Sequence, residues 1–220
     1  MDRELDSAVA TFVRFMEHAP LAVTIANLEH ALEGAERGGI AEQLPTHGVS
    51  PELLRAARYI RDQVGRVSDV IHASAIALAL PHLLEPGEVL RRPSLAAGND
   101  SSRPFDVETN RRIAEFKLAQ WAGADAMRKR QLFKDFVELA ADDSGRAAEL
   151  YVLGQRPIHF LASTKAPATW GLDRFPATQT TFQQHFGSLD VPIGAFVASM
   201  GCRVRVIDLE KRLPDLFAGE

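Results

Sequence analysis

Residues 103–117 read RPFDVETNRRIAEFK, and this stretch decides how the rest of the chain is interpreted. Apolar and polar residues alternate on both sides of a short polar segment at 109–112. Side chains of a β-strand point to opposite faces in turn, so this pattern predicts two antiparallel strands joined by a turn. One face of this hairpin is suited to burial and carries Phe105, Val107, Ala114, Phe116 and Leu118.

The other face of the hairpin gathers charged groups. A turn of two or of four residues leaves Asp106 on the same face as Glu115 and Lys117. Mg²⁺ prefers oxygen ligands and usually takes only one or two protein carboxylates. A neighbouring ammonium group can orient or help to deprotonate an attacking water and offset the charge of a phosphate, while the metal lowers the pKa of that water. These are the parts needed to hydrolyse a phosphodiester.

A structural explanation competes with this chemical one. The same residues would form the solvated polar face of an amphipathic hairpin, with an ion pair between its strands. Glu108 shares the face and is an auxiliary candidate, but its place near the turn favours solvated surface.

The flanking sequence predicts further helices and strands around the hairpin. Ser50 and Pro51 are suited to begin a helix. Ser68 then precedes a nearly all-apolar helix that ends near Pro81 and is expected to be buried. The remaining expected elements are helices over 6–18, 20–36 and 124–141, strands over 89–97, 148–153 and 203–209, loop over 162–177, and short helices near 157–161, 180–186 and 192–200.

From Ser50 the order is therefore helix, strand, strand, strand, helix, strand, which indicates a mixed α/β or α+β class. The Gly38-Gly39 pair breaks the helical pattern. We expect a helical region over residues 1–48, packed on an α/β domain over residues 49–220.

Composition restricts the classes of protein to which the chain can belong. It has 220 residues, 46% of them apolar and 25% charged, as in an ordinary globular protein. A formal net charge of −4 means that nucleic-acid binding would need a local basic patch. A single cysteine excludes an intramolecular disulfide and suits a reducing cytoplasm. The N-terminus lacks a signal-peptide pattern and the longest apolar run is too short for a membrane span, so we expect a cytoplasmic protein without a membrane partner.

Asp106, followed nine residues later by Glu115-Phe116-Lys117, resembles the motif of the restriction-endonuclease-like, or PD-(D/E)XK, nuclease superfamily. The order of elements from Ser50 to Leu153 is similar to the core of that superfamily. In one departure, Pro104 stands two residues before Asp106 instead of next to it.

This resemblance implies a Mg²⁺- or Mn²⁺-dependent nuclease acting on nucleic acid, most simply DNA. Asp106 and Glu115 would be metal ligands together with the backbone carbonyl of Phe116, and Lys117 would be the catalytic lysine. Members often take an extra acidic ligand from the helix before the sheet, where Asp69 stands with His72 one turn later. A capping aspartate and a core histidine are the structural alternative for these two. Such nucleases often pair two subunits, so a homodimer is also implied.

A basic segment follows the motif. Seven basic and two acidic residues lie between Arg111 and Lys134, a concentration typical of phosphate contact. Arg128 and Lys134 are the candidates to bind phosphate, although such a run also suits an exposed helix face. Two other functions stay open: a non-catalytic protein on the same scaffold that binds nucleic acid or a partner protein, and a phosphoesterase for a small substrate.

Overall fold

The computed structural model describes residues 3–17, 19–33, 37–64, 67–95, 104–121 and 125–217. The chain divides into two compact units, Met1–Val67 and Ser68–Glu220. This division falls after the helix that begins at Pro51, whereas the sequence suggests a boundary at residue 48. That helix belongs to the first unit because it packs against the first helix of the chain.

The first unit is helical. It contains α1 (Arg3–Phe15), α2 (Leu21–Leu32), α3 (Arg37–Thr46) and α4 (Pro51–Val64). The predicted N-cap is confirmed, since Ser50 Oγ accepts a hydrogen bond from the Leu53 amide at 3.2 Å. α2 ends at Leu32 and α3 begins at Arg37, so the helical pattern is interrupted next to Gly38-Gly39, and both glycines lie in the first turn of α3. Glycine lowers helix propensity but does not forbid a helix.

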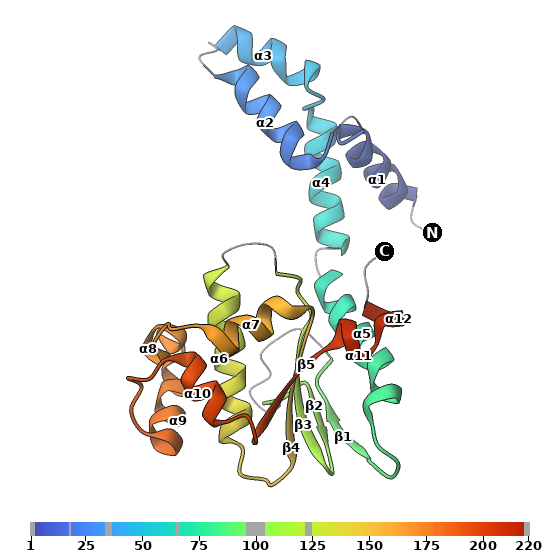
Figure 1. Ribbon diagram of the computed structural model, residues 1–220. Helices are drawn as coiled ribbons and strands as arrows, with labels where there is room; N and C mark the ends of the chain where they lie inside the picture. The colour runs from blue at the N-terminus through green and yellow to red at the C-terminus, as the bar shows by residue number, and fades with distance from the viewer. Residues whose placement is uncertain are drawn as a thin grey trace. The chain divides into compact units, whose positions relative to one another are not determined.

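The second unit contains a five-stranded mixed sheet, so the predicted mixed α/β class is confirmed (Figure 1). The strands are β1 (Leu90–Pro93), β2 (Val107–Thr109), β3 (Arg112–Lys117), β4 (Ala147–Val152) and β5 (Val204–Asp208), and they lie side by side in this order. β1 to β3 pair antiparallel, whereas β3, β4 and β5 run parallel. Parallel neighbours require crossovers, which the intervening helices supply.

Helices cover both faces of this sheet (Figure 1). One face packs against α6 (Ala126–Ala141) and a group of shorter helices around the aromatic core, namely α7 (Gln155–Ser163), α8 (Ala168–Leu172), α9 (Pro176–Phe186) and α10 (Ile193–Ser199). The other face packs against α5 (Val67–Leu83), α11 (Leu209–Arg212) and α12 (Pro214–Phe217). β3 and β4 are therefore covered on both faces, as is usual for parallel strands.

Two expectations about the helices are wrong. α5 is not buried all round, because among its described side chains only the stripe of Ile76, Ala79 and Leu83 is buried, while Val70 and Leu78 are 64% and 57% exposed. The helix lies on the outside of the sheet, so one stripe of it meets the core. The segment 162–177 contains α8, a short helix fixed by packing against α6. Within the described residues, no helix is long and apolar enough to cross a membrane.

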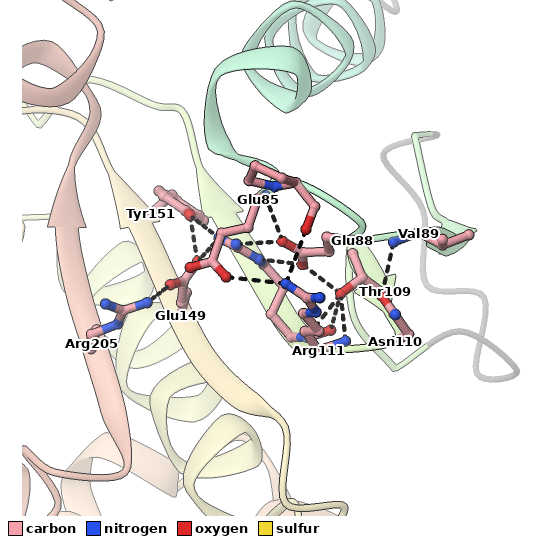
Figure 2. A network of polar contacts seen from close by, with 11 residues as sticks. Glu85, Glu88, Val89, Thr109, Asn110, Arg111, Glu149, Tyr151 and Arg205 are labelled. Carbon is pink, nitrogen blue, oxygen red and sulfur yellow. Dashed lines mark hydrogen bonds and ion pairs between the residues drawn. The ribbon is translucent and has the colours of Figure 1, made fainter.

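A buried polar network joins β3, β4 and β5 with the connection before β1 (Figure 2). Arg112 donates to both carboxylate oxygens of Glu88, at 2.5 and 2.6 Å, and to Glu149 at 2.8 Å. Glu149 also accepts from Tyr151 and Arg205. Burial acts to raise the pKa of Glu88, but the Arg112 guanidinium, the Glu85 amide and the Thr109 hydroxyl together outweigh it and hold this pKa at about 2. The network fixes the start of β3, and thereby the hairpin that carries the charged motif.

Candidate active site

The turn between β2 and β3 sets the register of the charged residues. Asn110 and Arg111 form a two-residue turn, and the Thr109 hydroxyl accepts the amides of Arg111 and Arg112 at 3.0 and 2.8 Å. Val107 pairs with Ala114 and Glu108 pairs with Ile113. The pairing ends at Val107 and Ala114, so Asp106 lies just before β2, and its carboxylate is close enough to Glu115 to repel it.

Asp106 is held by two different elements. Its Oδ2 accepts the Phe116 amide at 2.8 Å, so the side chain of the residue just before β2 is tied to β3. Its Oδ1 lies 3.2 Å from His72 Nε2 on α5, and both side chains are about four-fifths or more buried, at 16% and 15% exposure. His72 therefore reaches the motif. The Asp69 side chain lies outside the described residues.

Lys117 lies between two carboxylates. Its Nζ is 2.7 Å from Asp135 Oδ2 and 3.1 Å from Glu115 Oε2. Asp135 is 2% exposed, and Lys134 Nζ lies 3.3 Å from its other oxygen. Three acidic groups and two ammonium groups thus meet where β3 ends against α6.

Sequence reasoning missed Asp135, although a signal was present. Asp135 stands three residues after Leu132 and four before Leu139, so it lies on the apolar stripe of α6. All three are buried. A carboxylate on a buried helical stripe needs a partner inside the protein, and Lys117 is that partner.

Burial is the largest cause that raises the pKa of Glu115, and repulsion from Asp135 and Asp106 adds to it. Lys117 opposes these effects, and the resulting pKa is about 8. Burial alone would lower the pKa of Lys117, but Asp135 and Glu115 outweigh it and raise that pKa well above the ordinary lysine value. At neutral pH, Lys117 is therefore an ammonium group, and a substantial share of Glu115 carries a proton.

The donor set is compatible with a hard cation of the Mg²⁺ type. Asp106 and Glu115 supply carboxylate oxygens close to each other, and their mutual repulsion is the kind that a cation relieves. Within the described residues, no group of three or more His, Cys, Asp or Glu side chains is arranged to hold a metal ion. The available set is thus two carboxylates, within the range that Mg²⁺ uses.

The two candidate phosphate ligands are engaged in local contacts. Lys134 forms ion pairs with Asp135 and, at 2.6 Å, with Glu138. Arg128 lies 3.0 Å from Asp125 and donates to the Gln120 carbonyl at 2.9 Å. Arg128 thereby ties the start of α6 to the segment after β3, and Lys134 belongs to the buried charge cluster.

The position of Glu108 near the turn suggests a solvated surface, but this expectation is wrong. Glu108 is 8% exposed and forms an ion pair with Arg146 at 2.9 Å. The face that carries Glu108 also carries the buried Ile113, because these two residues are paired across the strands. Glu108 therefore lies towards the turn, away from Glu115 and Lys117.

Comparison with protein-family models, with curated proteins and with solved structures finds no match to this chain. The case for a function accordingly rests on the geometry and charges described above.

Proposed function

We propose that this protein is a metal-dependent nuclease that hydrolyses phosphodiester bonds of DNA. The observation that carries the proposal is the cluster at the end of β3. Asp106 and Glu115 lie close together, repel each other, and adjoin a lysine held by ion pairs. The order α5, β1, β2, β3, α6, β4 is the same helix-strand-strand-strand-helix-strand order as in the PD-(D/E)XK core, which supports that superfamily as the finer fold assignment.

In this proposal each side chain has a separate role. Asp106 and Glu115, with the Phe116 carbonyl, hold Mg²⁺ or Mn²⁺, which when bound acts as a Lewis acid and lowers the pKa of a coordinated water. Lys117 stays protonated, because its pKa is raised, so it orients the water and offsets phosphate charge instead of removing a proton. Asp135 is a positioning residue that holds the Lys117 ammonium group in place.

The first test is cleavage of a mixed panel of single-stranded and duplex DNA and RNA in Mg²⁺ or Mn²⁺. Lys117→Ala should lower the cleavage rate a hundredfold or more, since it removes a charged group from the reacting centre. The exposed residue Lys165 supplies a matched control, and Lys165→Ala should cleave like the wild type. Circular dichroism of both variants checks the fold. A wild-type protein that cuts nothing on this panel would overturn the proposal.

A second candidate is a non-catalytic protein on the same scaffold that binds nucleic acid or a partner protein. Asp106 favours it, because both carboxylate oxygens already contact protein groups, His72 and the Phe116 amide. Calorimetry with Mg²⁺ separates the two candidates. Heat that is present for the wild type and lost in Asp106→Ala supports the nuclease, whereas no binding heat for either protein supports the scaffold.

A further inference from the structure

A hollow of about 760 Å³ lies beside the candidate active site, outside the charge cluster. Its walls come from the segment after β3, the first turns of α6, and α7, which follows β4. It is lined by Trp121, Lys129, Gln155, Arg156, Ile158, His159, Phe160, Ala162, Ser163 and Thr164. β3 ends at Lys117, and α7 begins at Gln155, soon after the end of β4. The hollow therefore opens at the carboxyl edge of these parallel strands, where α/β proteins commonly bind ligands.

Aromatic rings form part of this wall. The rings of Trp121 and Phe160 lie 5.8 Å apart, and Phe160 in turn contacts Trp170 at 6.4 Å. Trp121 and Phe160 are only half-buried, so part of each ring is open to a ligand. Partly exposed aromatic side chains are the surfaces on which unpaired nucleobases stack.

The charge of the hollow is positive. Its lining includes Lys129, Arg156 and His159 and has no acidic residue. Lys129 Nζ lies 5.6 Å from the centre of the Phe160 ring, and Arg156 donates to the Trp121 carbonyl at 2.6 Å. Within the described part of the chain, neither cation is paired with a carboxylate. These charges contrast with Lys134 and Arg128, which acidic neighbours already neutralise.

We propose that this hollow binds an unpaired nucleotide of a single-stranded nucleic acid. The base stacks on Trp121, and the phosphates on either side lie near Lys129 and Arg156. In a stacked duplex both faces of each base are covered by its neighbours, so a duplex cannot offer a free base to the hollow. This inference rests on the proposed nuclease function and names its substrate as a single strand, or a duplex with an unpaired end.

The test uses tryptophan fluorescence in the presence of EDTA, where metal-dependent cleavage is blocked. The chain has two tryptophans, so Trp170→Phe leaves Trp121 as the sole source of tryptophan emission. A single-stranded oligothymidine should quench this emission saturably, and a duplex of equal length should bind at least tenfold more weakly. An acidic peptide of equal charge controls for simple charge attraction. Equal quenching by that peptide, or binding of duplex as tight as that of the single strand, would overturn the inference.

Substitutions of residues in the hollow test whether the single strand binds there. Trp121→Ala should weaken single-strand binding, measured by fluorescence anisotropy, by roughly five- to a hundredfold, and Trp121→Phe should restore much of it because a ring remains. Arg156→Ala should weaken binding and reduce its salt dependence, whereas Arg174→Ala, an exposed arginine outside the hollow, should not.

The outcomes separate this inference from the nuclease proposal. If the wild type cleaves nucleic acid but Trp121→Ala binds single strands like the wild type, the hollow is not the site and the nuclease proposal stands. If Trp121-dependent binding occurs without any cleavage, the hollow is confirmed and the nuclease proposal fails.

Discussion

Glu115 shows how neighbouring charges set the chemistry of one residue. Its carboxyl group is buried, and two other carboxylates, Asp106 and Asp135, repel its ionised form. Lys117 opposes burial and this repulsion but does not cancel their sum, of which burial is the largest part, so the carboxyl retains a proton to higher pH than an exposed glutamate. A cation at this site would take the place of that proton, and metal binding should therefore release protons and strengthen as the pH rises towards 8.

The raised pKa of Glu115 predicts a pH-dependent stability. The carboxyl titrates near 8 in the folded protein and near the ordinary 4.5 in the unfolded chain. Between these values the folded state binds more protons, so this contribution is complete below pH 4.5 and is lost as the pH rises to 8. Glu115→Gln cannot titrate and should flatten the decline, which urea denaturation at several pH values measures.

The matched control is Glu85→Gln, at an exposed glutamate, which should keep the wild-type dependence on pH. Parallel stability curves for the wild type and Glu115→Gln between pH 5 and 8 would contradict the assigned protonation.

At this scale the alternation expected over residues 105–107 is wrong, because Phe105 packs in the cluster around α6 and Val107 in the cluster around α5, although Asp106 still lies near Glu115. The sequence did place Glu115 and Lys117 on one face of β3, but it did not predict what surrounds them. Burial of that face could not be foreseen, since it comes from α6, a helix beyond the hairpin. The partnership between Lys117 and Asp135 is likewise a contact between elements.

At the scale of elements, the polar network around Arg112 holds the sheet together. It contains charged groups from the connection before β1, from β3, from β4 and from β5 (Figure 2). Glu149 is its central acceptor and is 1% exposed. A buried charge that loses its partner is costly, because protein surroundings replace its hydration poorly.

Glu149→Ala should therefore destabilise the protein by roughly 3–5 kcal/mol, because Arg112 loses one of its two carboxylate partners and Arg205 loses its hydrogen bond to Glu149. Chemical denaturation gives the change in the free energy of unfolding. Glu85→Ala is the control, since its ion pair with Arg111 is exposed and 3.5 Å long, and it should cost less than about 1 kcal/mol. Similar losses for both variants would show that the network does not stabilise the sheet.

Periodicity predicted most elements of the second unit from the sequence, including β4, β5 and α6. It could not predict how much of α5 is exposed, because a uniformly apolar helix carries no signal of which side meets the core. α8 was missed for another reason. It has only five residues, follows Pro167 and contains Gly171, and its buried Ala168 and Leu172 pack in the core formed largely by α6 and its neighbours.

At the scale of the whole molecule, the second unit contains its own core. Both clusters of buried apolar side chains around the sheet are formed by residues between Ile76 and Phe217. A truncated chain of residues 67–220 should therefore fold alone, with a single cooperative urea transition and a native near-ultraviolet circular dichroism spectrum. A broad transition without near-ultraviolet signal would mean that this unit depends on residues 1–66.

The parallel pairing of β4 with β5 also has a consequence for biosynthesis. The ribosome completes β4 at residue 152 but reaches β5 only at residue 204. Throughout that interval the nascent chain has an open edge at a strand of sequence AAELYV. Unpaired apolar edges are templates for aggregation. The time needed to synthesise the segment from α7 to α10 thus sets how long the edge of β4 stays unpaired, and prone to aggregation, in each new chain before β5 pairs with it.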